Sequence, residues 1–368
     1  MKKNHLLLVA VIVAALTVQT ANAKIWRVNN KSNYNGTSLY GDNFGGTSAY
    51  PVFNQISQAV GWAAVVNNDT LYIEGSTTVY ASATVTKKLA IIGTGYFLTE
   101  NPKVTNDGLE SKVSQLSINI EGSHVIGMNV VNTGYASDGK IYINANGISV
   151  KRCRIERGIQ FATELTDVYI ANNFFSNVIA TNAFYTNGYA SFIAPTNIVF
   201  NNNICQKTLN WNAWPIQQCN NNVFDGPVNA SPNLQLQFIT SECSNNILKT
   251  TNAAVSINSG NNEKLTHNIG TLVTQFGTSN QNKVVADMTT LFVTAGTSDG
   301  KYKLKNGSPG SNNGSDGTDR GVFGGSVVPN RYTLSGLANI PVVYKLTTPG
   351  VATPAAGLPV TISARTIK

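Results

Sequence analysis

The segment Phe200-Asn201-Asn202-Asn203-Ile204-Cys205 decides the fold, because the chain repeats its pattern. The pattern is an apolar residue, a spacer, two Asn-like positions and a closing apolar pair. Full copies lie at 170–175, 219–224 and 243–248, a fading copy at 265–270, and weaker versions at 92–97, 125–130 and 150–155. The closing positions are 19 to 33 residues apart. A short fixed core with variable spacing is typical of solenoid turns whose insertions are confined to loops.

Stacking explains the residue choices. Equivalent side chains of successive coils lie roughly 4.8 Å apart, so each position of the pattern forms a ladder. The first position is predicted to point inward: Ile92, Val125, Val150, Ile170, Phe200, Cys219, Cys243 and Leu265. The second Asn position is predicted to supply the left-handed bend and a ladder of amides: Asn173, Asn203, Asn222, Asn246 and Asn268. Hairpin turns and regular period-2 strands are not evident, which disfavours a propeller or a sandwich. The predicted fold class is therefore all-β, a right-handed parallel β-helix.

The first residues resemble an export signal. Lys2 and Lys3 precede an apolar run from Leu6 to Leu16, and Ala21-Asn22-Ala23 has the form of a signal-peptidase site. The run is about half of the roughly 20 residues needed to span a bilayer. We therefore expect residues 1–23 to be a signal peptide and the chain to be secreted, without a transmembrane segment or a lipid anchor. Periplasm, cell surface and extracellular medium remain open.

The next segments are expected to cover and open the solenoid. Apolar residues at helical spacing within 52–64 predict an N-terminal capping helix. Asn68-Asp69-Thr70-Leu71-Tyr72-Ile73-Glu74-Gly75 then opens the first coil, and Leu89-Ala90-Ile91-Ile92-Gly93 follows. We divide the chain into a signal peptide (1–23), an N-terminal lead with the capping helix (24–68), a β-helix with a closing segment (69–325) and an extended tail along the flank of the solenoid (326–368).

These motifs resemble the pectate-lyase-like β-helix superfamily. The segments from Asp299 to Leu304 and from Asp319 to Gly324 are similar to the closing segment of secreted bacterial members. The resemblance covers roughly residues 50–325 and implies the fold. It is nearly silent on activity, because lyases, hydrolases, tail spikes, adhesins and inert surface proteins share the architecture.

The motifs of the family's enzymes are missing. Its hydrolases use an Asn-Thr-Asp, an Asp-Asp pair and a Gly-His-Gly, whereas the 18 acidic residues here are never adjacent. The Asp-rich calcium sites and the Arg-x-Pro-x-x-Arg strand of its lyases are also missing. If the chain is an enzyme, a polysaccharide lyase is therefore favoured over a glycoside hydrolase. We expect no cofactor, with Ca²⁺ reserved for the lyase alternative.

Metal and nucleic-acid sites are not indicated. The chain has three His, one of them His5 in the signal, so a His-based metal site is not expected. Asp299-Gly300 and Asp316-Gly317-Thr318-Asp319 are fragments of calcium loops at best, and turn chemistry explains them better. The net charge of +8 fits either an acidic polymer or ordinary solubility. No nucleic-acid partner is expected.

One strand face carries candidate catalytic residues. The positions that flank the inward ladder point outward, which would bring together His124, Lys151, Asp167 and Tyr169 on three adjacent coils, with Arg154 and Arg157 beyond the bend. Such groups could support proton abstraction next to a carboxylate. The alternative is a solvated face with a salt bridge between Lys151 and Asp167.

A long insertion carries aromatic residues. The coil that ends at 205 is about ten residues longer than its neighbours and contains Phe184, Tyr185, Tyr189 and Phe192, and Trp211 and Trp214 follow. We expect Tyr185, Tyr189, Trp211 and Trp214 to offer a platform for a sugar ring. The alternative is that the rings only pack the loop against the solenoid wall.

Two cysteines occupy one ladder. Cys219 and Cys243 lie one coil apart at an inward position, within the roughly 4.4–6.8 Å range of Cα separations that disulfides accept. Parallel side-chain vectors oppose a bridge, so both states stay open. Cys153 and Cys205 fall at different positions of the repeat and are not expected to pair.

Together these patterns predict a secreted β-helix protein that binds a polysaccharide along its solenoid face without catalysis. The alternatives are a lyase that acts by β-elimination on a uronate-containing polymer, and a structural or adhesive surface protein. The oligomeric state stays open.

Overall fold

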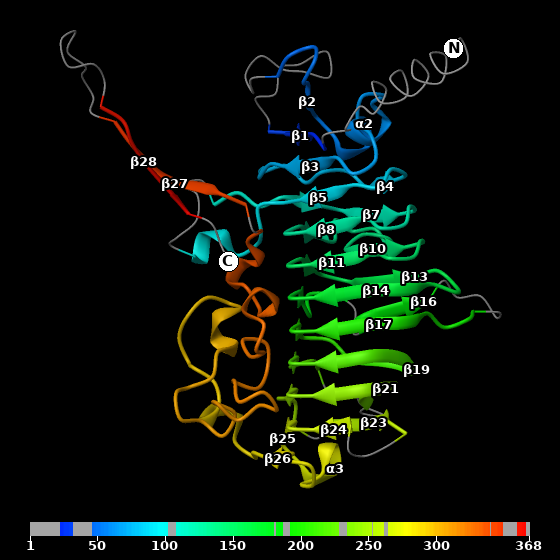
Figure 1. The fold of residues 1–368 in the computed structure, drawn as a ribbon, viewed down its shortest axis with the longest axis vertical. Coiled ribbons are helices and arrows are strands. Elements are labelled where there is room, and N and C mark those ends of the chain that lie inside the picture. Colours follow the sequence, from blue (N-terminus) through cyan, green and yellow to red (C-terminus); the bar gives the residue numbers. More distant parts are fainter. Residues whose placement is uncertain are drawn as a thin grey trace, which may run out of the picture.

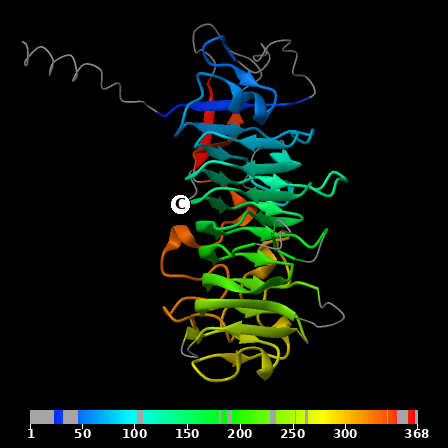
Figure 2. The same cartoon turned by 90° about the vertical axis from the view of Figure 1, so that its right-hand side faces the viewer.

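The computed structural model describes residues 23–31, 46–101, 108–179, 182–186, 192–227, 234–251, 253–260, 264–338, 340–348 and 359–365. This part of the chain is mostly β, with two short α-helices, α2 (Ile56–Gly61) and α3 (Val273–Phe276). Its strands are piled along the long axis of the molecule (Figures 1 and 2). The same residues include five 3₁₀ turns: η2 (Leu98–Glu100) in the first half, and η4 (Met288–Thr290), η5 (Gly300–Tyr302), η6 (Val328–Asn330) and η7 (Leu334–Gly336) in the second.

Three parallel sheets make up the body. Sheet A contains, in spatial order, β2 (Val52–Phe53), β1 (Ile25–Val28), β3 (Thr70–Ile73), β5 (Ala90–Ile92), β8 (His124–Ile126), β11 (Ser149–Lys151), β14 (Thr166–Ala171), β17 (Thr196–Asn201), β19 (Leu209–Asn220), β21 (Leu234–Ser244) and β23 (Ala254–Asn258), with β24 (Leu265–Thr266) also on β21. Sheet B contains β6 (Lys112–Val113), β9 (Asn129–Val130), β12 (Arg154–Ile155), β15 (Phe174–Phe175), β18 (Ile204–Cys205), β20 (Val223–Phe224), β22 (Ile247–Leu248), β25 (Ile269–Gly270) and β26 (Lys283–Val284). Sheet C contains β4 (Ala83–Val85), β7 (Gln115–Ile118), β10 (Lys140–Ile143), β13 (Gly158–Phe161) and β16 (Phe184–Thr186).

The chain visits the three sheets in rotation. From β8 onward it passes from sheet A to sheet B to sheet C and returns to sheet A one strand further along, at β11 and again at β14. Every pairing between these strands is parallel. This arrangement of long parallel sheets is consistent with the predicted β-helix.

The inward ladder is confirmed over most of its length. Val125, Val150, Ile170, Phe200 and Cys219 pair directly from strand to strand, and all are fully buried. The prediction is wrong at Ile92, because Ile91 pairs with Val125 and is buried, whereas Ile92 pairs with Ile126 on the outer face. The Ile92 side chain therefore points away from the core.

The two Asn positions have different roles at the bend, whereas the prediction gave both roles to the second position. The left-handed residue is the first Asn, since Asn172, Asn202, Asn221 and Asn245 have φ between 55° and 60°. The second Asn forms the predicted amide ladder and is fully buried in five successive coils, Asn173, Asn203, Asn222, Asn246 and Asn268.

Asn222 illustrates the ladder. Its Nδ2 donates to the carbonyl oxygen of Phe200 at 2.8 Å and to Oδ1 of Asn246 at 3.0 Å. Its Oδ1 accepts from the backbone N–H of Asn203 at 2.8 Å and from Asn203 Nδ2 at 3.2 Å. Each amide thus joins three coils and satisfies backbone groups that the bend takes out of the sheets.

A second apolar core covers the outer face of sheet B. The first member of each closing pair points outward there: Phe174, Ile204, Val223, Ile247 and Ile269, all buried. The covering side chains come from the later part of the chain: Met288, Leu291, Phe292, Tyr302, Val322 and Tyr332. Sheet B is therefore buried on both faces from β15 to β25, which explains why both residues of these short strands are apolar.

Residues 311–338 form a segment that we call the C-terminal strap. It runs back along the bend between sheets A and B, from the last coils toward the first (Figure 1). Arg320 Nη1 donates to the carbonyl oxygen of Asn268, and Asn202 Nδ2 donates to that of Val322. Near the other end, Arg152 Nη1 donates to the carbonyl oxygen of Leu337 at 2.8 Å.

The predicted extended tail is only partly correct. Residues 326–338 belong to the strap, but β27 (Val342–Thr347) and β28 (Thr361–Arg365) pair in antiparallel fashion. This hairpin leaves the body rather than lying along its flank (Figure 1). Two adjacent strands can satisfy each other's backbone groups, which a single extended segment cannot do.

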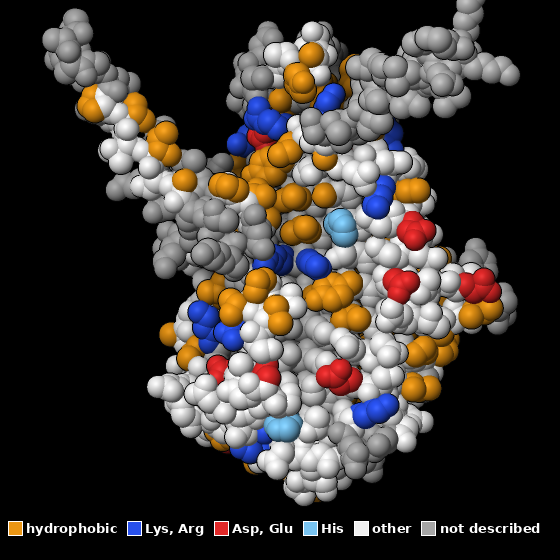
Figure 3. All heavy atoms as spheres, viewed as in Figure 1, with side chains coloured by type: hydrophobic (Ala, Val, Ile, Leu, Met, Phe, Trp, Pro, Cys, Tyr) orange, Lys and Arg blue, Asp and Glu red, His pale blue; other side chains and the backbone are white. Residues whose placement is uncertain are grey.

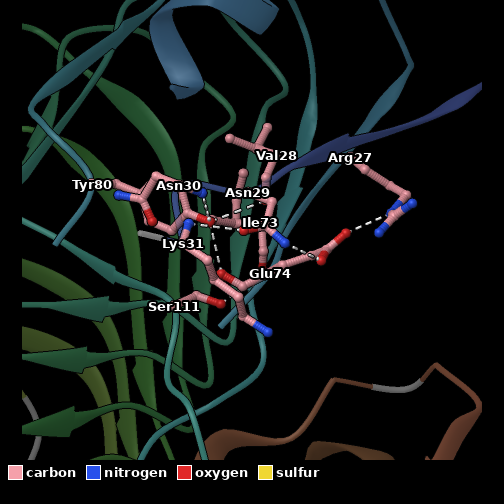
Figure 4. A network of polar contacts seen from close by, with 9 residues as sticks. All are labelled: Arg27, Val28, Asn29, Asn30, Lys31, Ile73, Glu74, Tyr80 and Ser111. Carbon is pink, nitrogen blue, oxygen red and sulfur yellow. Dashed lines mark hydrogen bonds and ion pairs between the residues drawn. The ribbon is translucent and has the colours of Figure 1, made fainter. Parts of the chain in front are cut away.

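The N-terminal strand is fastened to the first coil by polar contacts (Figure 4). Arg27 Nε forms a 2.5 Å ion pair with Glu74 Oε1, and Asn29 Nδ2 donates to Glu74 Oε2 at 2.7 Å. The Tyr80 hydroxyl donates to the carbonyl oxygen of Val28 at 3.1 Å. The helix expected within 52–64 is the six-residue α2, because Val52 and Phe53 pair with β1 instead.

The four cysteines are free and buried. Cys219 and Cys243 occupy equivalent positions on neighbouring strands, as predicted, and each sulfur accepts a hydrogen bond from the amide of the Asn three residues later, at 3.5 Å and 3.3 Å. Of the two states that the sequence leaves open, the structure shows the reduced one.

Thiol titration is expected to find no reactive group in the native protein and four after denaturation. Burial raises the pKa of Cys153 and of Cys205 to about 12 and also shields both sulfurs from reagent. Counting with an aromatic disulfide reagent, with and without guanidinium, measures both values. Two thiols after denaturation would instead indicate a bridge between Cys219 and Cys243.

Candidate functional site

A groove runs along the outer face of sheet A beside the C-terminal strap. It consists of an upper cavity of about 260 Å³ and a lower cavity of about 210 Å³, and both are lined by Tyr169 and Asn330. The upper cavity is completed by Ile126, Lys151, Arg152, Asn172 and Pro329. The lower cavity is completed by Asn201, Asn202, Asn220, Asn221, Glu242, Ser244, Asn245, Ser315, Asp316, Gly324, Gly325, Ser326 and Val327. Basic and acidic side chains both lie around the groove on this face (Figure 3).

Strand pairing lines up the floor of the groove. Ile126 pairs with Lys151, Lys151 with Ala171 and Ala171 with Asn201, and the column continues to Asn220. Because side chains alternate between the faces of a strand, these residues point outward wherever the intervening ladder residue points inward. The outward positions predicted from the pattern are thus confirmed from β8 to β21.

Three of the four candidate catalytic residues come together. His124 and Tyr169 both pair with Ser149, one from each side, and Lys151 Nζ lies 4.5 Å from the centre of the Tyr169 ring. Asp167 does not join them. It has a φ of 60° at an irregular position of β14, is exposed, and accepts a hydrogen bond from Asn197 of the next coil.

The alternative salt bridge between Lys151 and Asp167 is not formed. The ion pairs that the structure shows in the described part of the chain are Arg27–Glu74, Arg154–Glu156 and Lys249–Asp225. Arg154 is held by Glu156 at 2.9 Å and lies 5.4 Å from the ring of Phe97. Arg157 donates to the carbonyl oxygen of Asp138 instead. Neither arginine lines the groove.

Burial shifts the pKa of Lys151 and Tyr169 in the upper cavity and of His124 beside it. Burial lowers the pKa of Lys151, and the neighbouring charge of Arg152 lowers this pKa further. Burial and the charges of Lys151 and Lys88 lower the pKa of His124, so neutral imidazole predominates at pH 7. Burial raises the pKa of the Tyr169 hydroxyl, which therefore stays protonated. None of the described residues that line this cavity is acidic.

Two polar atoms beneath the lining of the groove have no partner in the protein. Oδ1 of Asn172, whose side chain is only 3% exposed, and Oδ1 of Asn221 are buried acceptors that no donor of the protein reaches. One of the two residues lines each cavity. An unmade hydrogen bond at a buried acceptor costs roughly 1–3 kcal/mol. Because both atoms are enclosed by the protein, a ligand hydroxyl reaches them only if the side chains above them move.

The aromatic residues do not form the expected platform. Trp211 is 1% exposed and packs 5.0 Å from Phe161 and 5.2 Å from Phe184 between ring centroids. It lies two residues after Leu209 in β19, so strand alternation directs both side chains inward. The prediction that Trp211 stacks on a sugar is therefore wrong.

The remaining aromatic candidates are dispersed. Trp214 is half-buried against Phe192, at 4.8 Å between ring centroids. Tyr185 is half-buried in sheet C, where Lys140 Nζ lies 5.1 Å from its ring centre. Tyr189 lies outside the described residues. Packing of the loop against the wall thus describes Trp211 and Trp214 better than a shared sugar-binding surface.

The structure adds residues that sequence reasoning did not propose as a site. The wall of the groove comes from the strap, with Asn330 and Val327, and its floor includes Asn201, Asn220 and Glu242. The outward direction of the floor residues was predictable from alternation. Their partners in the wall were not, because more than 70 residues of sequence separate them.

The described residues include no group of three His, Cys, Asp or Glu side chains placed to hold a metal ion. Asp316 accepts from the backbone N–H and the hydroxyl of Thr318, at 3.0 Å and 2.7 Å, which is the behaviour of a turn. Asp299 is buried and accepts from the backbone N–H of Ser335 at 2.6 Å. Among the described helices, none combines the length and the apolar character required to cross a bilayer.

Comparisons with protein-family models, with curated proteins and with solved structures gave no significant match. The function is therefore inferred from the geometry of the groove.

Proposed function

We propose that the chain is a secreted right-handed parallel β-helix of the pectate-lyase-like kind that binds a polysaccharide in the sheet A groove without cleaving it. The observation that carries the proposal is the row of Asn side chains that lines the lower cavity, namely Asn201, Asn202, Asn220, Asn221 and Asn245. The leader-like residues 1–23 support export. The right-handed sense follows from the strong preference of parallel crossovers for that hand.

The lining of the groove suits a sugar polymer. Carboxamides both donate and accept hydrogen bonds, as sugar hydroxyls do, and Glu242 and Asp316 add further acceptors to the lower cavity. Apolar surface is available for the CH faces of the rings from Tyr169, Pro329 and Val327, of which Val327 is 54% exposed. A groove that crosses several coils can contact several successive sugar residues.

The proposal is tested by replacing the two residues that both cavities share. The double variant Tyr169→Ala, Asn330→Ala is expected to lose at least tenfold in affinity for the glycan that a glycan array identifies, which corresponds to roughly 1.4 kcal/mol. Affinity electrophoresis in gels containing that glycan measures the loss.

The matched control is Tyr135→Ala, which removes a tyrosine that is 73% exposed and outside both cavities. It is expected to bind as the wild type does. Wild-type binding by the double variant would overturn the site, and an array without any retained glycan would overturn the function.

A lyase is the second candidate, favoured by the contact of Lys151 with Tyr169. A lysine with a lowered pKa can act as a base, and a neighbouring phenol can pass on a proton. Incubation with uronate polymers would then yield an unsaturated product that absorbs in the ultraviolet, and Lys151→Ala would abolish it. A chain that neither binds nor cleaves glycans would fit the structural or adhesive role.

A further inference from the structure

An apolar strip lies on the outer face of sheet A, directly above the groove. It consists of Tyr72, Ile92 and Ile126, which pair in register across β3, β5 and β8. All three side chains are partly exposed. Hydrophobic side chains gather over these upper strands in the space-filling view (Figure 3). Contiguous apolar surface at the rim of a polar site commonly marks part of a binding surface.

The strip and the groove form one line. Ile126, the last residue of the strip, also lines the upper cavity and pairs with Lys151 on the next strand. Along this column the side chains change from apolar to cationic at Lys151, and after the small Ala171 they become carboxamides at Asn201 and Asn220. Each step along the column is roughly 4.8 Å between backbones, so Lys151 lies one step beyond the end of the strip.

A charged pair lies at the upper end of the strip. Tyr72 pairs with Arg27, and Arg27 forms a 2.5 Å ion pair with Glu74. The strip therefore spans two coil steps, roughly 10 Å, between a polar boundary and Lys151. An apolar chain that lies along this column continues directly into the groove at Lys151, so the strip suits a chain that is attached to the ligand of the groove.

We infer that the groove takes a glycan that is joined to an apolar chain through an anionic linkage. The inference rests on the proposed glycan binding and names the class of glycan. The sugar occupies the carboxamide-lined lower cavity, the anionic group lies at Lys151, and the apolar chain covers Ile126, Ile92 and Tyr72. The charge requirement follows from the upper cavity, where Lys151 contributes a cation and the described lining contributes no acid, while the guanidinium of Arg152 donates to the carbonyl oxygens of Leu337 and Pro329.

Each end of the ligand contributes to the binding free energy. A half-buried ammonium attracts an anion more strongly than an exposed one because water screens it less. Burial of a hydrocarbon chain on the strip removes apolar surface from water on both partners. Neither contribution is available to a neutral sugar polymer without a tail.

The inference is tested with three soluble probes on the full chain, each below its critical micelle concentration. They are octyl glucosyl phosphate, octyl glucoside and glucose 1-phosphate. Isothermal titration is expected to show that the first binds at least tenfold more tightly than either of the others. Lengthening the chain from butyl to octyl is expected to tighten binding, and lengthening it further to dodecyl is not, because the strip ends at Arg27.

Two variants separate the contributions. Ile92→Ser is expected to weaken octyl glucosyl phosphate to the level of glucose 1-phosphate and to leave glucose 1-phosphate unchanged. Lys151→Gln is expected to weaken it to the level of octyl glucoside and to leave octyl glucoside unchanged. The matched control Ile239→Ser removes an apolar side chain that is 41% exposed elsewhere on sheet A, and it is expected to have no effect.

Equal affinity for all three probes, or equal effects of Ile92→Ser and Ile239→Ser, would overturn the inference. So would sedimentation of the wild type, but not of Ile92→Ser, with phosphatidylglycerol vesicles, which would show that the strip binds a lipid surface. Retention of untailed oligosaccharides on the glycan array is scored separately. If they are retained while the tail brings no gain, the inference fails and the proposed function stands.

Discussion

Phe200→Asp is expected to abolish folding. The Phe200 side chain is fully buried in the inward ladder, with ring centroids 5.4 Å from Phe184 and 5.6 Å from Phe175. Loss of a buried phenylalanine costs roughly 3–5 kcal/mol, and a carboxylate without a counter-ion in its place adds a further desolvation penalty. Because the free energy of unfolding of a domain is only about 5–15 kcal/mol, these two losses leave little or no stability. Circular dichroism and size-exclusion chromatography would show an unfolded or aggregated chain.

The neighbouring residue provides the control. Val199 precedes Phe200 in β17, is partly exposed and points outward. Val199→Asp introduces the same charge on the other face of the same strand, and its melting temperature is expected to stay within a few degrees of the wild type. Cooperative wild-type melting of Phe200→Asp would show that the inward register is wrong.

Asn222→Ala is expected to lower the free energy of unfolding by roughly 2–6 kcal/mol. The substitution leaves the backbone N–H of Asn203 without its acceptor inside the core, whereas Asn203 Nδ2 keeps the carbonyl oxygens of Ile170 and Asn201 as acceptors. It also removes the donor to the carbonyl oxygen of Phe200. Urea denaturation followed by tryptophan fluorescence measures the loss.

Asn221→Gly separates the amide ladder from the bend itself. Asn221 has a φ of 56°, which glycine adopts without strain, and its Oδ1 has no partner in the protein. We expect a change within about 0.5 kcal/mol. If the two variants lost equal stability, the bend conformation rather than the amide ladder would be the stabilising element.

The sequence predicted the inward ladder well wherever the repeat was complete. It failed at the weak copy, since Ile91 and Ile92 are both apolar and either could occupy the inward position. Side chains in a strand alternate with a period of two, so an error of one residue exchanges the faces. The same exchange brings Ile92 into the outer strip, and the error therefore had a functional consequence.

The bend was predicted in kind but not in detail. Asn tolerates left-handed backbone, and the pattern contains two adjacent Asn-like positions, so composition alone does not assign the roles. A clue lay in the first position, which is occupied by Arg152 and His267 in weaker copies, whereas the second is Asn from 173 to 268. A buried amide ladder tolerates less variation than an outward left-handed residue does.

The second core has a signal in the sequence. Both residues of each closing pair are apolar, as in Phe174-Phe175 and Ile247-Leu248. A strand that is apolar on both faces must be covered on both. The pattern therefore required a covering segment, although only the structure identifies it as the part of the chain around Met288 to Tyr332.

The candidate site was predictable only on one side. Alternation placed Lys151, Tyr169 and Asn201 on the outer face, and the structure agrees. The opposing wall belongs to the strap, whose position depends on contacts far apart in the sequence, such as that of Asn202 with Val322. Aromatic content was a poor guide, because the same property that lets Trp211 stack on a sugar also makes it suitable for the core.

The strap changes how the stack can come apart. In a repeat protein each coil contacts only its neighbours, so unfolding can begin at either end and spread coil by coil. Here Arg320 fastens the strap to Asn268 in a late coil, whereas the backbone N–H of Tyr96, in an early coil, donates to Ser335 at 2.9 Å. Fraying of the last coils therefore loosens contacts at the first ones, and the energetics cease to be those of a one-dimensional array. Such a chain unfolds as a cooperative unit, with hydrogen-exchange protection of similar size in early and late coils, and that protection is complete only after its last segment has been synthesised.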